Sequence, residues 1–233
     1  MKLRIAWLAI LFLALTAVPA WAQNWSYDNG PIYGIDPRQC ALCRTGDAWT
    51  INFGYIVSDT YIAGGLRVTD FAFGVWEFPG DTMSSVGWSI TSGENGGTVF
   101  GSGVASGSSL SDRFISTNHY GYNIDAITVT GLNVPEVSGT LYWLNLYNAA
   151  VPSGDPVFWD ENSGVGCKGS GCPSSASESA VGTIASEAFT VYGGGCGGGC
   201  ELQAGGGAPE PSSIMLFGSG ILGLAGLLRR KLF

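Results

Sequence analysis

The sequence between the two chain ends predicts an all-β fold, an antiparallel β-sandwich that is either jelly-roll or immunoglobulin-like. Three observations lead to this prediction. Apolar residues recur with a period of two, turn signals rich in Gly, Pro and Asn separate short apolar runs, and no amphipathic helical pattern occurs between the ends. A domain spanning residues 23–192 is long enough to enclose one hydrophobic core.

The clearest strand covers residues 85–90, where Val86, Trp88 and Ile90 alternate with small or polar residues. Because successive side chains of a strand point to opposite faces, we expect Trp88 to lie in the core. Residues 71–76 and 141–146 are apolar on both faces, which is typical of central strands. Further strands are expected at 49–57, 61–69, 98–105, 124–130 and 187–192.

The N-terminus has the pattern of a secretory signal peptide. Lys2 and Arg4 precede an apolar run over residues 5–18, and the small-residue motif Ala20-Trp21-Ala22 follows. We therefore expect a signal helix at residues 1–22, translocation by the Sec translocon, and a mature chain that begins at Gln23.

The C-terminus reads as a flexible stalk followed by a short membrane segment. Residues 193–208 are Gly-rich, and the apolar run 214–228 ends in a basic cluster. Fifteen residues make about 22 Å of helix, which is shorter than the roughly 30 Å hydrocarbon core. Since basic flanks stay cytoplasmic, the domain before residue 209 should lie on the periplasmic side of the inner membrane.

The order of features in residues 209–233 resembles a known sorting tail. Pro209-Glu210-Pro211, an apolar helix and Arg229-Arg230 look like the PEP-CTERM tail that exosortases recognise in Gram-negative bacteria that make exopolysaccharide. The resemblance implies that these residues are a sorting substrate with an exosortase as partner. It also implies a protein that is first tethered to the inner membrane through its C-terminal transmembrane helix and then reaches the cell surface or extracellular matrix.

The six cysteines form three close pairs, Cys40 with Cys43, Cys167 with Cys172, and Cys196 with Cys200. In an exported chain this spacing favours local disulfides. Two alternatives are a redox dithiol at Cys40 and Cys43 and a zinc site built from four thiolates, but the first lacks a βαβ context and the second lacks paired CxxC knuckles.

Composition argues against nucleic acid as a partner and against catalysis. The net charge of −8 provides no basic surface for phosphates. His119 is the single histidine and lies in a polar stretch that reads as a loop, and no GxSxG, HExxH or P-loop motif occurs. Carboxylate pairs for glycoside hydrolysis can be drawn from Glu77, Asp81, Asp160 and Glu161, but sequence gives no separation. We expect no enzyme, no cofactor and no metal.

Aromatic residues are the strongest candidates in the sequence for contacts with a ligand. Trp159 and Tyr122 have polar neighbours, so we expect both rings to be at least partly exposed, and with Asp160 they are the candidate ligand-binding residues. Residues 160–162 could also hold calcium, although such a segment is usually a solvated turn. The sequence therefore predicts a structural or adhesive protein of the cell surface or extracellular matrix, with exopolysaccharide as a ligand candidate. The alternative is a carbohydrate-binding module without catalysis.

Overall fold

A computed structural model describes residues 25–32, 48–162, 164 and 166–193. In these ranges the regular structure is β-strand apart from one short 3₁₀ turn at Gly107–Ser109, which confirms the all-β prediction. No helix in the same ranges has the length and apolar character needed to span a bilayer. The predicted signal helix at 1–22, most of the stalk and the sorting tail at 209–233 lie outside the described residues.

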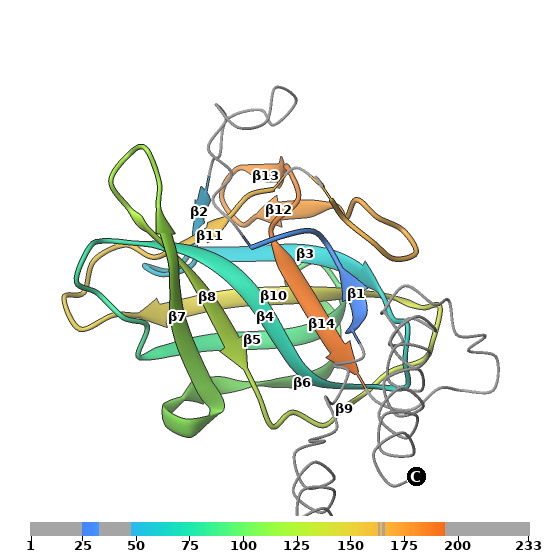
Figure 1. Cartoon of the computed structure of the whole chain (residues 1–233). Helices are drawn as coiled ribbons and strands as arrows, with labels where there is room; N and C mark the ends of the chain where they lie inside the picture. Colours follow the sequence, from blue (N-terminus) through green and yellow to red (C-terminus); the bar gives the residue numbers. More distant parts are fainter. Residues whose placement is uncertain (1–24, 33–47, 163, 165, 194–233) are drawn as a thin grey trace, which may run out of the picture. The chain divides into compact units, whose positions relative to one another are not determined.

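Among the described residues, eight strands form one sheet around the long strand β4 (Figure 1). The register shows β8 and β9 along one edge of β4, and β14 and β11 along the other. The strands of this eight-stranded sheet are β1 (Trp25–Asp28), β2 (Ala48–Thr50), β4 (Arg67–Glu77), β7 (Leu110–Thr117), β8 (Asn123–Val129), β9 (Val134–Pro135), β11 (Phe158–Asp160) and β14 (Phe189–Gly193).

A six-stranded sheet forms the second layer, and every pairing in both sheets is antiparallel. In spatial order its strands are β13 (Gly182–Ile184), β12 (Ala176–Glu178), β3 (Ile56–Ile62), β10 (Leu141–Ala150), β5 (Ser85–Gly93) and β6 (Gly96–Ser106). The antiparallel prediction is confirmed, whereas the choice between a jelly-roll and an immunoglobulin-like topology stays a prediction.

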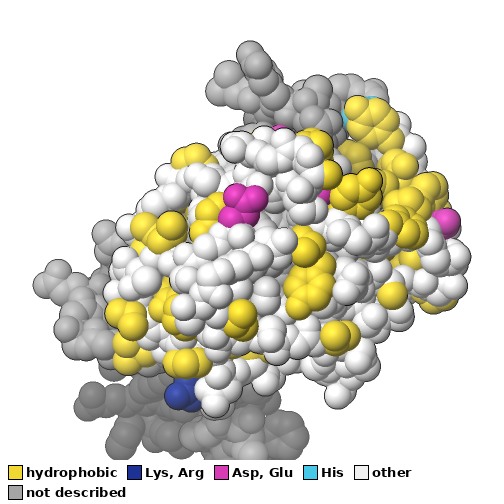
Figure 2. Space-filling view, turned by 180° about the vertical axis from the view of Figure 1, so that it is seen from behind, with side chains coloured by type: hydrophobic (Ala, Val, Ile, Leu, Met, Phe, Trp, Pro, Cys, Tyr) yellow, Lys and Arg dark blue, Asp and Glu magenta, His cyan; other side chains and the backbone are white. Residues whose placement is uncertain are grey.

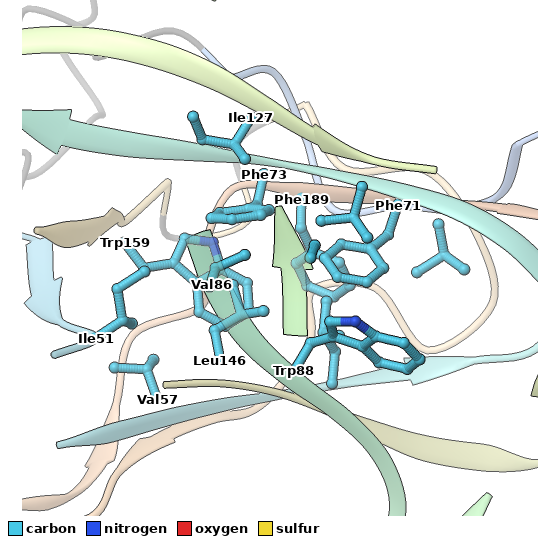
Figure 3. Close-up of a cluster of buried hydrophobic side chains, with 14 of the residues drawn as sticks. Ile51, Val57, Phe71, Phe73, Val86, Trp88, Ile127, Leu146, Trp159 and Phe189 are labelled. Atoms are coloured by element: carbon cyan, nitrogen blue, oxygen red, sulfur yellow. The ribbon is translucent and has the colours of Figure 1, made fainter. Parts of the chain in front are cut away.

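The inner faces of the two sheets enclose one hydrophobic core (Figure 3). Trp88 of β5 is 7% exposed and packs edge-on against Phe71 of β4, with ring centroids 6.0 Å apart. This arrangement confirms the expected inward position of Trp88. Leu144 and Leu146 of β10 are fully buried on the same side of the six-stranded sheet.

Two expected strands have different boundaries in the structure. The predicted strand 49–57 is interrupted between β2 and β3, where Phe53 and Gly54 have φ values of 55° and 89° that no strand accommodates. The predicted strand 61–69 is also interrupted, because β3 ends at Ile62 and β4 begins at Arg67. Gly64 lies within this break, and a Cβ at this position would clash with the carbonyl oxygen of Ser26.

Candidate functional site

The position of Trp159 differs from the sequence prediction. The expectation of partial exposure was wrong, because the side chain is 0% exposed and its indole N–H donates to the carbonyl of Ala188 at 3.1 Å. Trp159 lies opposite Val75 of β4, and its ring packs edge-on against Phe73 and Phe189 (Figure 3). Trp159 is therefore part of the core and is not available to stack on a ligand.

Asp160, the next residue of β11, points to the outer face of the eight-stranded sheet. The indole N–H of Trp76 donates to its Oδ1 at 2.6 Å, while Oδ2 has no hydrogen-bond partner among the described residues. Burial raises the pKa of Asp160 to about 7; the hydrogen bond from Trp76 lowers it, and the charge of Glu161 raises it. Asp160 thus anchors Trp76 and is too deeply buried to contact a ligand directly.

A glycine and an N-terminal side chain cover this carboxyl. A Cβ on Gly74 would lie 3.1 Å from the Cβ of Asp160 and 2.9 Å from the Cγ2 of Ile32. The segment that contains Ile32 therefore packs on the outer face of β4, and only a residue without a side chain leaves room for it at position 74. The same contact explains why Asp160 is only 1% exposed.

Trp76 and four neighbouring rings form a cluster that we call the aromatic end. Tyr120 and Tyr122 both lie with ring centroids 5.9 Å from Trp76, and Tyr122 also contacts Phe78 at 4.9 Å and Phe158 at 5.8 Å. Exposure increases outward across the cluster. Trp76 is 7% exposed, the rings of Phe78, Tyr122 and Phe158 are half-buried, and Tyr120 is 57% exposed.

The two tyrosines lie on one hydrogen-bonded turn between β7 and β8. The Oδ1 atom of Asn118 accepts the backbone N–H groups of Tyr120 and Tyr122, both at 3.0 Å, and Gly121 takes the positive φ of 89° that the turn requires. His119 is exposed in this turn, as expected, with its ring centroid 3.7 Å from that of Tyr120. Figure 2 shows hydrophobic side chains gathered at its upper right, beside the histidine.

At the end of the eight-stranded sheet where the aromatic end lies, acidic side chains occupy the inner face. Glu77 follows Trp76 in β4 and therefore points the opposite way, and Asp125 of β8 and Asp112 of β7 share its face. Glu77 is 0% exposed, and neither of its carboxylate oxygens has a hydrogen-bond partner among the described residues. Burial, followed by the charges of Asp112, Asp125 and Asp81, raises the pKa of Glu77 to about 8.

The carboxylates singled out from the sequence separate into two groups. Glu77 and Asp81 interact with each other and with acids of β7 and β8, whereas Asp160 and Glu161 lie near Glu187. Within the part of the chain that the structure describes, no group of three or more His, Cys, Asp or Glu residues is arranged to hold a metal ion.

Of the three expected local disulfides, the one whose cysteines lie within the described residues is formed. Cys167 and Cys172 are bonded, with their Cα atoms 6.0 Å apart, which confirms the expectation for this pair. Cys40, Cys43, Cys196 and Cys200 lie outside the described residues, and so do the sorting residues Pro209, Glu210, Pro211, Arg229 and Arg230.

Sequence reasoning did not identify Trp76 as the centre of the site, although a signal was available. In the strand 71–76, Phe71, Phe73 and Val75 alternate with two small residues and Trp76. This contrast of large and small side chains predicts the core face and leaves Trp76 on the other face. Phe78 and Phe158 had no comparable signal, because both lie at strand ends where alternation is short.

Comparison with known proteins finds the PEP-CTERM protein-sorting motif at residues 208–231, which confirms the resemblance seen in the sequence. The motif implies export, a membrane-anchored sorting signal and processing by an exosortase. No curated protein and no solved structure matches the chain.

Proposed function

We propose that the β-domain of this exported protein attaches to extracellular polysaccharide through the aromatic end and acts as an adhesive component of the cell surface or matrix. The observation that supports the proposal is the pair of rings on the β7–β8 turn, Tyr120 and Tyr122, held against the buried ring of Trp76. Flat rings that are fixed in place and partly exposed can stack on the apolar face of a sugar at little entropic cost.

Hydrogen bonds hold both Trp76 and the turn that carries Tyr120 and Tyr122 in place. Trp76 is hydrogen-bonded to a buried carboxylate. Four hydrogen bonds to Asn118 close the turn that carries the tyrosines: two to its side chain, one from its backbone N–H to the carbonyl of Tyr122 at 2.9 Å, and one from the N–H of Gly121 to its carbonyl at 3.1 Å. A ring held in this way loses little side-chain freedom when a ligand binds, which favours affinity.

The proposed role is binding without catalysis. Trp76 and the tyrosines lie on the outer face of the eight-stranded sheet, whereas Glu77, Asp112 and Asp125 lie on its inner face. A sugar stacked on Tyr120 would thus have the sheet between it and these carboxylates. Glycoside hydrolysis uses two carboxyl groups that flank the scissile bond, so the opposite-face position of these three carboxylates supports a binding role in this proposal.

Sorting would bring the domain to its ligand. In this proposal the Sec translocon exports the chain, the C-terminal segment holds the domain on the periplasmic side of the inner membrane, and the exosortase acts at the motif of residues 208–231. Release to the surface would then expose the aromatic end to the exopolysaccharide outside the cell.

Binding of the full chain to purified exopolysaccharide from the host strain tests the proposal. We expect Tyr120→Ala to weaken binding roughly tenfold, a loss of about 1.4 kcal/mol, and Tyr122→Ala to have a similar effect. Leu141→Ala is the control, since Leu141 is 50% exposed and begins β10 opposite Ile62 of β3, at the other end of the sandwich. Equal binding by Tyr120→Ala and Leu141→Ala, with all variants folded, would assign the domain a structural role without this ligand surface.

A further inference from the structure

Strand β6 forms an open edge of the six-stranded sheet. It pairs with β5 along one side, and no other described strand pairs with it along the other side. Residues 96–106 therefore present a row of backbone N–H and C=O groups that a further strand could continue.

The other described edge strands are short or carry charge or proline, as the two-residue β9 with Pro135 shows, and β6 has none of these three features. The edges β1, β2 and β13 have four, three and three residues. The edge β7 has eight residues and includes Asp112 and Arg113. In contrast, β6 has eleven residues, with neither a charged residue nor a proline. Short length, charge, proline and bulges are means by which proteins block an edge. The register shifts of β6 against β5 lie between Gly96 and Gly101, so residues 101–106 have the character of a pairing strand.

The sequence of β6 is compatible with pairing to its own copy. Residues 101–106 keep a regular register with β5. The register shifts between the two strands lie on the N-terminal side of Gly101. An antiparallel pair with Val104 opposite its own copy also places Gly103 opposite Ala105 and Ser102 opposite Ser106. No like charges meet in this register, and all the opposed side chains are small.

Val104 has the exposure expected at the centre of such a contact. It lies opposite Gly87 on the outer face of the sheet and is 68% exposed. Two β-branched side chains directly opposite each other would bury apolar area that each leaves in water in the monomer. Because β6 carries no charged residue, two copies of this acidic chain can pair here without like charges in contact.

We propose that β6 is the contact strand of a dimer of this chain, in which two six-stranded sheets join across a two-fold axis at Val104. This inference goes beyond polysaccharide attachment and stands whether or not the aromatic end binds sugar. The dimer carries two aromatic ends, and a molecule with two linked sites binds a repetitive polymer with higher avidity than one site does.

Sedimentation of the full chain in detergent, over a range of concentrations, tests this contact. We expect the wild type to dimerise and Val104→Lys to raise the dissociation constant about tenfold or more, because two lysines would oppose each other. Val181→Lys is the matched control, since Val181 is 60% exposed but lies between β12 and β13. Equal association of all three proteins, or a monomeric wild type, would overturn the proposal.

A cross-link and hydrogen exchange identify the strand directly. Under mild oxidation, Val104→Cys should form a covalent dimer that Val181→Cys does not form. Protection of the amides in residues 102–106 that point away from β5 should increase with protein concentration. If these amides are protected equally in the monomer, another part of the same chain covers the edge and the dimer assignment is wrong.

Discussion

The indole N–H of Trp76 donates to Oδ1 of Asp160 at 2.6 Å, which joins β4 to β11 on the outer face of the eight-stranded sheet. This hydrogen bond connects the aromatic end to the frame of the sandwich. It also explains how a carboxyl group that is 1% exposed is tolerated in a position covered by Ile32.

Removing the donor should destabilise the fold in a pH-dependent way. Trp76→Phe leaves Asp160 without its indole donor, and we expect the free energy of unfolding to fall by about 1–3 kcal/mol in addition to the smaller loss of ring contacts. The pKa of Asp160 is raised to about 7, so the unpaired carboxyl should cost more at pH 8 than at pH 5. Urea unfolding at the two pH values measures the difference. Adding Asp160→Asn to Trp76→Phe should remove the difference between the two pH values in the stability lost relative to the protein carrying Asp160→Asn alone. An equal loss from Trp76→Phe alone at both pH values would contradict this account.

Trp159 and Trp88 should be equally important for stability. Each packs in the core between the two sheets, so truncation to alanine should lower the free energy of unfolding by about 3–5 kcal/mol through lost burial and a residual cavity. For a domain of this size the melting temperature should fall by roughly 10 °C or more. Thermal melts of both variants, with Leu141→Ala as the exposed control, provide the measurement. A melt of Trp159→Ala close to the wild type would be incompatible with its burial.

Stability should decrease as the pH rises from 5 to 8. Burial raises the pKa of Glu77 to about 8, that of Asp59 to about 7 and that of Asp125 to about 6. Unfolded carboxyl groups titrate near pH 4, so the folded state holds these protons where the unfolded chain has released them, and the stability they contribute is lost as pH rises through the folded pKa values. Melting temperatures at pH 5 and pH 8 test the sign.

One substitution isolates the largest of these three pKa shifts. Glu77→Gln keeps the shape of the side chain but cannot ionise, so we expect it to raise the melting temperature at pH 8 and to have little effect at pH 5. Asp155→Asn changes a carboxyl outside this set and serves as the control. A wild-type protein that becomes more stable between pH 5 and pH 8 would show that other groups dominate the pH dependence.

Replacing Pro209, Glu210 and Pro211 with alanine should block sorting. The tripeptide lies inside the PEP-CTERM match at residues 208–231, and without it we expect the protein to accumulate in the inner membrane. Cell fractionation followed by immunoblotting checks the location, and mass spectrometry of the surface form checks whether the tail is cleaved. Wild-type amounts of the triple-alanine variant at the surface would show that the tail serves only as an anchor.

Local pattern was enough to predict much of the fold. Alternation identified β5 and the core position of Trp88, and close cysteine spacing identified the Cys167–Cys172 disulfide. The ends of strands were less predictable where the backbone turns at residues whose types give no strong turn signal. Phe53 adopts a positive φ that its side chain disfavours, so nothing in its residue type marks the end of β2.

By itself, the sequence determined the all-β class and the sorting motif at residues 208–231. It predicted a polar turn around Trp159 and Asp160, whereas the structure places the two residues on opposite faces of the strand β11. Only the tertiary structure decided which of those faces meets the second sheet, and so which of the two side chains enters the core. The reason is that alternation is a property of a few neighbouring residues, whereas burial depends on distant segments. Trp159 is covered by β14, and Asp160 is capped by Ile32 and paired with Trp76.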